Sequence, residues 1–335
     1  MSISSPFPYF GGKSKVAPIV WEKLGNVDNY LEPFGGSLAV LLARPDEHKW
    51  WEKKETAGDY SGVLVNFFRA IKHKPEEVAK ECLAPVNEAD LTARHLYLVR
   101  YENELNEKLA ADPDYYDVKA AAWWVWGISA WVGGDWMTGK GPWKPGDPNG
   151  PGVYRKMPMI AGSHGGKGIH KPLKGITSSE EVSETYLNNL YEIFKTLSNR
   201  LLRVRLACGD WKRLQGAASK SAANKITGIF LDPPYDSNMR RSDLYGKSDV
   251  ANGTSDGIHK EARDWALSLG GDPSYRIAYC SYEESEETSL FVTAGWTAYR
   301  WTASGGYSLQ SDNAAKDNRE KEIIWFSPHC LTNTL

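Results

Sequence analysis

Short apolar runs alternate with longer amphipathic stretches along this chain. The short runs predict strands that end near Glu32, Asp59, Cys208 and Leu231, with further strands over 276–282, 296–301 and 322–326. Apolar residues at helical spacing predict helices over 16–24, 63–71, 183–199 and 259–269. This alternation is typical of a doubly wound, Rossmann-like α/β sheet, and we expect the last two strands to form an antiparallel hairpin.

The strand that ends at Leu231 runs directly into Asp232, Pro233, Pro234 and Tyr235. Side chains at the carboxyl edge of a parallel sheet meet ligands there, and two prolines make the turn stiff. A carboxylate and a rigid carbonyl together accept both hydrogens of an aromatic amino group, while the tyrosine ring stacks on the base that carries it. The alternative for this tetrad alone is a plain Pro-Pro turn with a surface tyrosine.

Two glycine-rich turns precede helices near the N-terminus. The first comprises Tyr9, Phe10, Gly11, Gly12 and Lys13, where bare N–H groups and the lysine predict a small anion site. It is not a phosphate-binding P-loop, because Phe7 stands where that motif needs glycine. The second follows a strand, where a doubly wound sheet brings an adenosine-bearing cofactor close to the backbone. Its residues are Glu32, Pro33, Phe34, Gly35, Gly36 and Ser37. Each turn alone is also compatible with a simple connection.

Two further acids follow predicted strands. Asp59 stands where an acid commonly binds a ribose hydroxyl pair, although a cap for the next helix is an equal alternative. Asp210 and Trp211 form a similar corner, which suits either the amino group and face of a purine or a cap with a packed tryptophan. His259 is a lone histidine without a nucleophilic Ser or Cys partner, so we interpret it as structural.

Composition sets bounds on the class of protein. The 335 residues are 41% hydrophobic and 24% charged, as in ordinary globular proteins, and the net charge of −2 favours no partner. The four cysteines lie far apart without metal-ligand spacing, so we expect buried, reduced thiols and no metal. The N-terminus does not resemble a secretory signal, and no apolar run is long enough for a membrane span. A cytoplasmic protein without membrane contact is expected, in a bacterium or in a host cell if the source is a phage.

One segment has a composition unlike the rest. After a helical stretch over 72–117 and a Trp-rich run that predicts packed core, residues 136–175 are dense in Gly and Pro and contain a single acid. Such a segment is too long for a routine connection, and basic groups interleaved with Trp143 and Tyr154 suit contacts to phosphates and bases. We expect DNA binding by its side chains Lys140, Lys144, Arg155, Lys156, Lys167 and Lys171, with Lys174 and two histidines adding to the charge, and by Arg240 in the polar loop over 236–257. A solvated loop is the alternative.

Several motifs, taken in order, resemble the Dam-like family of adenine-specific DNA methyltransferases, in the alpha-type motif order. They are the first glycine turn, the Glu-Pro-Phe-Gly-Gly turn, Asp59, the Asp210 corner, the Asp-Pro-Pro-Tyr tetrad, Arg240 with His259, and residues 319–325. The resemblance covers most of the chain outside residues 75–195. It implies a methyltransferase sheet formed by residues 1–74 and 196–335, and a target-recognition insertion over 75–195. It departs from the family at Leu38, where a further glycine is usual, and in the Trp cluster that replaces an Asn-rich pattern.

The resemblance also implies the chemistry. Asp232, Pro233, Pro234 and Tyr235 would act on the amino nitrogen of an adenine flipped out of double-stranded DNA. S-adenosylmethionine would lie against Tyr9 to Lys13 at its methionine end, Glu32 to Ser37 in its middle, Asp59 at its ribose, Asp210 and Trp211 at its adenine, and Asp232 beside its methyl group. Alternatives are amino methylation of cytosine or RNA, or an inactive DNA-binding protein. Site-specific methylation by a monomer or weak dimer is expected, and a restriction endonuclease partner is left open.

Overall fold

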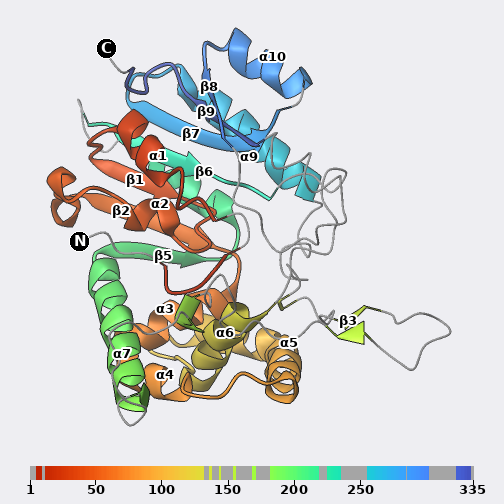
Figure 1. Cartoon of the computed structure of the whole chain (residues 1–335). Coiled ribbons are helices and arrows are strands. Elements are labelled where there is room, and N and C mark those ends of the chain that lie inside the picture. The colour runs from red at the N-terminus through yellow and green to blue at the C-terminus, as the bar shows by residue number, and fades with distance from the viewer. Residues whose placement is uncertain are drawn as a thin grey trace.

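The computed structural model describes residues 5–9, 12–131, 136–137, 143–144, 154–155, 168–170, 182–218, 225–234, 255–283, 285–301 and 322–332. Its centre is a seven-stranded sheet, drawn in Figure 1. The strands are β1 (Asn29–Glu32), β2 (Lys54–Asp59), β5 (Val204–Cys208), β6 (Thr227–Leu231), β7 (Tyr275–Tyr282), β8 (Thr297–Arg300) and β9 (Glu322–Phe326).

The strand order is β5-β2-β1-β6-β7-β9-β8, and the first five strands in this order are parallel. β9 runs antiparallel to both β7 and β8, so the hairpin expected at the end of the chain is confirmed. The last strand, β9, is inserted between β7 and β8, an order that no local sequence pattern indicated. The predicted α/β, Rossmann-like sheet is therefore confirmed.

Side chains alternate between the two faces of this sheet. Cys280 and Ile324 belong to the core cluster on the face covered by α1 (Ala17–Leu24), α2 (Ala39–Leu42) and α3 (Gly62–His73). Their chain neighbours Tyr279 and Ile323 belong to the cluster on the opposite face, with η4 (Trp211–Ala218), α9 (Ser255–Gly270) and α10 (Ser285–Thr293). Strands that are buried on both faces need apolar residues at successive positions. The apolar runs in β6 and β7 meet this need.

The helices that follow α3 gather beside the β5 edge of the sheet (Figure 1). They are α4 (Pro75–Glu81), α5 (Glu88–Ala111), α6 (Val118–Ala130) and α7 (Val182–Leu201). Trp124 and Trp126 of α6 are buried, so the packed core expected there is confirmed. The 3-10 turn η3 (Gly168–His170) docks on α6, while β3 (Trp143–Lys144) and β4 (Tyr154–Arg155) pair as a separate hairpin.

Helix α7 runs through the expected boundary at residues 195 and 196, and its last turn lies against the sheet. The division into domains at those residues stays a prediction. Helix α9 begins at Ser255, four residues before the predicted start at His259. The prediction missed this first turn because it is polar and lacks apolar periodicity. Helix α10 and the short 3-10 turns η1 (Asp46–His48) and η2 (Trp50–Glu52) had no sequence signal that we recognised.

Two further observations concern the cysteines and the possibility of a membrane-spanning helix. Cys82, Cys280 and Cys330 are buried and Cys208 is half-buried, and all four thiols are unpaired. Within the described ranges, no helix is both long and apolar enough to cross a bilayer.

The chain reverses its winding direction between β1 and β6. From β1 it moves outward through β2 to β5, and from β6 it moves the other way to β7. Since parallel strands end at one edge, the residues after β1 and β6 meet at this switch point, where ligands of doubly wound sheets bind. This brings Glu32 and Asp232 to the same edge.

Candidate active site

Lys13 and Asp232 form an ion pair at the switch point. Lys13 Nζ lies 2.8 Å from Asp232 Oδ2, and only 3% of the lysine side chain is exposed, against 19% of the aspartate. Burial alone would lower the pKa of Lys13, but the carboxylates of Asp232 and Glu322 outweigh it and raise that pKa above its ordinary value. Lys13 therefore stays charged and is directed at the acid of the tetrad, and not at an anion held by the first glycine turn.

Glu322 is a second carboxylate near this lysine, and sequence reasoning did not assign it a role. Its Oε2 lies 4.0 Å from Lys13 Nζ, and Glu322 is buried at the start of β9. The sequence did contain a signal for this role in the alternation of faces along β9. Glu322 lies on the same, core-facing side of the strand as Ile324 and Phe326. A carboxylate at a core position needs a partner of opposite charge.

The first glycine turn closes on itself. The N–H of Gly12 donates to the carbonyl of Tyr9 at 3.1 Å, so it is not a bare donor as the sequence indicated. A side chain at Gly36 would come within 2.6 Å of the Tyr9 ring, which shows that this ring lies directly on the second turn. Phe10 and Gly11 lie outside the described residues.

The second glycine turn, residues 33–38, is tied to the end of β2. Gly35 N–H donates to the carbonyl of Gly58 at 2.7 Å, and Gly36 N–H donates to Asp59 Oδ2 at 2.8 Å. Leu38 adopts the left-handed conformation, with φ 56° and ψ 28°, at the position where the family usually has glycine. The backbone therefore keeps a glycine-like path although its side chain is leucine, and that side chain is buried.

Asp59 joins three segments. Besides Gly36, its carboxylate accepts the N–H of Ser61 at 2.8 Å, and its carbonyl accepts the N–H of Gly209 at 2.9 Å. Burial raises the pKa of Asp59, although the backbone donors oppose that shift. The side-chain cap of α3 is Ser61, so the alternative of Asp59 as that cap does not apply.

The corner after β5 lies beside the second glycine turn. The rings of Trp211 and Phe34 have centroids 5.4 Å apart, and Trp211 is buried against Trp265 as well. Asp210 is exposed and accepts the N–H of Lys212 at 2.9 Å. The tryptophan is therefore packed, as the second alternative expected, while a role of this corner toward a purine stays a prediction.

Glu32 is the buried acid that opens the second turn. Its Oε2 accepts the hydroxyl of Tyr30 and the N–H of Leu41, each at 2.9 Å. Burial raises the pKa of Glu32 to about 8, against the opposing effect of these donors and with a smaller contribution from Asp232. This carboxyl group therefore titrates near neutral pH.

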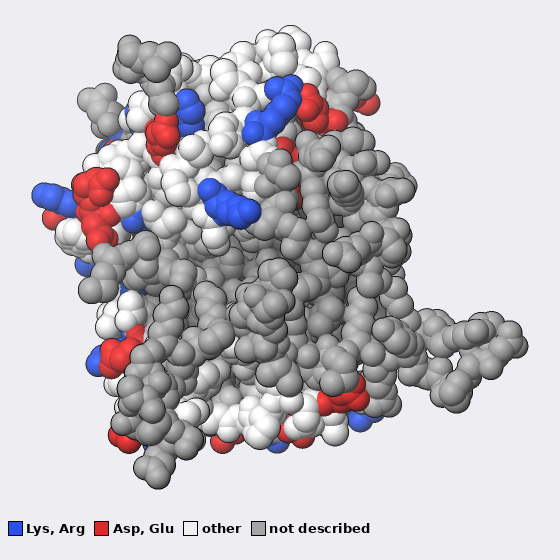
Figure 2. All heavy atoms as spheres, viewed as in Figure 1, with Lys and Arg blue, Asp and Glu red and all other residues white. Residues whose placement is uncertain are grey.

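The structure describes only part of the predicted DNA-binding set. In the hairpin, Lys144 pairs with Tyr154, and Trp143 pairs with Arg155. His170 is not a surface cation: its Nε2 lies 3.0 Å from the Trp126 carbonyl, and burial lowers the pKa of its ring. Lys140, Lys156, Lys167, Lys171, Arg240 and the tetrad's Tyr235 lie outside the described residues. On the face in Figure 2, the described charges of both signs are scattered.

The left-handed conformation of Leu38 predicts an unusual order of stabilities. Removing the buried side chain of Leu38 should lower the free energy of unfolding by about 2–5 kcal/mol. Leu38→Gly should nevertheless be more stable than Leu38→Ala by about 1 kcal/mol, because alanine is strained in the left-handed conformation and glycine is not. Leu42 of α2 is the matched control, where alanine should be the more stable. Denaturant unfolding measures both pairs, and a more stable Leu38→Ala variant would contradict the assigned backbone.

The raised pKa of Glu32 predicts a pH-dependent stability. The protonated acid is favoured in the folded state, so its contribution is complete below the unfolded pKa of 4.5 and is lost as pH rises through about 8. Between those two pH values the unfolding free energy of the wild type should fall relative to Glu32→Gln by about 1.4 kcal/mol per pH unit, and the difference should level off above about pH 8, where both states are ionised. Denaturant unfolding between pH 6.5 and 9.5 tests this. A constant difference would mean that Glu32 ionises as an ordinary carboxyl.

Comparison with known proteins agrees with this geometry. Residues 9–121 match the model of the D12 class N6 adenine-specific DNA methyltransferases, a stretch that includes both glycine turns and Asp59. No curated protein matches the chain. The chain resembles this Dam-like family over that stretch, and it is an enzyme that methylates the N6 amino group of adenine in DNA.

Proposed function

We propose that this methylation uses S-adenosylmethionine, as methyltransferases generally do, bound along the second glycine turn. The observation that carries the proposal is the convergence of that turn, Asp59 and Asp232 at one edge of the sheet. The local structure fits such a cofactor. A side chain at Gly35 would lie 3.0 Å from the Gly58 carbonyl, so the turn is compact, and the Phe34 and Trp211 rings border it.

The ribose, adenine and middle portions of the proposed cofactor site each have a described residue. Asp59 supplies carboxylate oxygens for ribose hydroxyls, Trp211 and Asp210 lie where an adenine ring would end, and Ser37 and Pro33 line the middle of the turn. Glu32 supports the turn from beneath. When bound, S-adenosylmethionine supplies an electrophilic methyl group, so the protein's task is to position the acceptor nitrogen.

Asp232 is proposed to accept a hydrogen of the adenine amino group, together with the carbonyl of Pro233. An aromatic amine is a poor nucleophile because its lone pair is delocalised into the ring. Acceptors fixed at its hydrogens favour tetrahedral geometry and stabilise the positive charge that develops on nitrogen. Lys13, at hydrogen-bond distance, orients the Asp232 carboxylate, and Glu322 holds Lys13 from the other side.

The target adenine lies inside a duplex, so the proposal includes extrusion of the base at a cost of a few kcal/mol. Stacking on Tyr235 and contacts to phosphates by the basic segment would offset this cost. The hairpin β3–β4 supports that assignment, because its pairing sets one basic and one aromatic residue opposite each other in both pairs. Site specificity would reside in this segment.

Labelled methyl transfer tests the proposed chemistry. Purified protein with labelled S-adenosylmethionine and mixed-sequence duplex DNA should produce labelled N6-methyldeoxyadenosine on nucleoside analysis. Asp232→Asn should lower the rate by about 10²–10³-fold, the usual cost of removing one such electrostatic contact. Asp28→Asn is the control, since Asp28 is an ion-paired acid just before β1, at its opposite end. Label on cytidine, on RNA only, or equal transfer by Asp232→Asn would overturn the assignment.

The hairpin predicts a salt-dependent loss of DNA binding. Lys144→Ala and Arg155→Ala should each weaken binding and lower the slope of log K against log salt by about 1. Lys80→Ala, an exposed lysine of α4, serves as the control for general loss of positive charge. Unchanged affinity and slope in both hairpin variants, measured by fluorescence anisotropy, would place the DNA surface elsewhere.

A further inference from the structure

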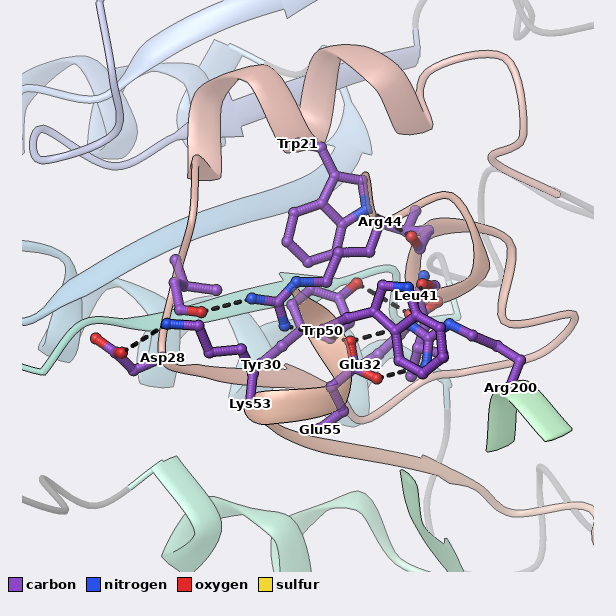
Figure 3. Close-up of polar contacts among 12 residues, drawn as sticks. Trp21, Asp28, Tyr30, Glu32, Leu41, Arg44, Trp50, Lys53, Glu55 and Arg200 are labelled. Atoms are coloured by element: carbon purple, nitrogen blue, oxygen red, sulfur yellow. Dashed lines mark hydrogen bonds and ion pairs between the residues drawn. The ribbon is translucent and has the colours of Figure 1, made fainter. Parts of the chain in front are cut away.

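A buried carboxylate near the start of β2 binds two arginines. Glu55 of β2 accepts Arg200 at both oxygens, at 2.6 and 3.0 Å, and Arg44 at 3.2 Å. All three side chains are 1% exposed or less. Figure 3 shows Arg44 and Arg200 approaching Glu55 from different sides, Arg200 from helix α7. Neither the sequence motifs nor the proposed chemistry accounts for this cluster.

The two arginines differ in the backbone that they bind. Arg200 also donates to the carbonyl of Leu41 at 2.9 Å, whereas Arg44 donates to the carbonyl of Val27 at 2.5 Å. Val27 lies before β1, at the edge opposite the switch point. Leu41 belongs to α2, the four-residue helix that directly follows the glycine turn. Of the two guanidinium groups, only that of Arg200 therefore binds the backbone of α2, although the N–H of Arg44, just after α2, also donates to the Leu41 carbonyl at 3.2 Å.

Leu41 is held from both sides. Its N–H donates to Glu32 Oε2, and its carbonyl accepts Arg200 (Figure 3). A helix of four residues makes few internal hydrogen bonds and is marginal by itself, so contacts from outside determine where it lies. Trp50 covers the Arg200 guanidinium, whose carbon lies 4.0 Å from the ring centroid, and this limits the movement of that side chain.

Stability alone is a weak reason for such a cluster. A buried ion pair often contributes no more than apolar residues of the same volume, because desolvation of the charges is costly. A planar guanidinium, however, supplies several donors in a fixed fork. Arg200 uses this fork to bind both Glu55 oxygens and the Leu41 carbonyl at once, which a lysine with its single nitrogen cannot reproduce.

We propose that Arg200 is a positioning residue for the cofactor turn. Through Leu41 it fixes α2, and with it the turn of residues 33–38 to which S-adenosylmethionine would bind. Arg200 lies in the last turn of α7, just past the expected end of the recognition insertion at residue 195, so a helix that begins in that insertion holds the cofactor turn in place. This inference rests on the proposed cofactor site.

Arg200→Lys and Arg44→Lys form a matched pair for the test. Each keeps a cation beside Glu55 and gives up one carbonyl contact. Binding of S-adenosylmethionine is measured by calorimetry, and KM and kcat by methyl transfer to DNA, well below the unfolding midpoint. Arg200→Lys should raise Kd and KM for S-adenosylmethionine on the order of tenfold, the loss of one charged hydrogen bond, with kcat nearly unchanged. Arg44→Lys should leave Kd within about twofold.

Each outcome has a distinct meaning. Equal Kd values for wild type and folded Arg200→Lys would overturn the inference and leave the proposed function intact. A wild type that transfers no methyl group and binds no S-adenosylmethionine would overturn the proposed function and, with it, this inference. If Arg200→Lys does not fold, Trp50→Ala is the second variant, because it removes the cover of Arg200 and, besides that, only exposed contacts of Trp50 with Asp46 and Trp51. Trp50→Ala should also raise the Kd for S-adenosylmethionine above that of the wild type. An unchanged Kd would again contradict the proposal.

Discussion

The parallel pairing of β1 with β6 is the constraint on which the rest of the site depends. Both strands are buried along their whole length, and their register sets Tyr30 beside Gly228 and Leu31 beside Ile229. Because the winding direction changes between these strands, no crossover helix covers the edge where both end. The second glycine turn and the Asp-Pro-Pro turn, almost two hundred residues apart in sequence, therefore emerge side by side.

Charge burial in this part of the sheet is balanced group by group. Lys13 is fully enclosed but has two carboxylates near its ammonium group, and Glu55 has two arginines. Glu32 has only neutral donors, the Tyr30 hydroxyl and the Leu41 N–H, so its pKa rises to about 8. The same low-dielectric environment that is costly for an unpaired charge strengthens the paired ones, and it makes the orientation of Asp232 by Lys13 effective.

The second glycine turn combines strain and support. Leu38 occupies a left-handed conformation that leucine rarely adopts, and such conformations persist only where the surroundings determine them. Here the surroundings are Asp59 at Gly36, Gly58 at Gly35, and the Glu32 and Arg200 contacts at Leu41. The side chain of Leu38 is buried against the turn, which offsets part of the backbone strain.

Local sequence determined most elements of this protein and the order of its motifs. Apolar period and turn residues predicted β1, β2, β6, β7, α1, α3 and α7 within a few residues, because these signals depend on neighbours in the chain. Asp232, Asp59 and the glycine turns were recognised for the same reason. Only the tertiary structure decided that β9 lies between β7 and β8, that Glu322 meets Lys13, that His170 packs half-buried on α6, and that Arg200 reaches Leu41. Each of these contacts joins residues distant in sequence, and the packing of the sheet and its helices, not any local pattern, brings them together.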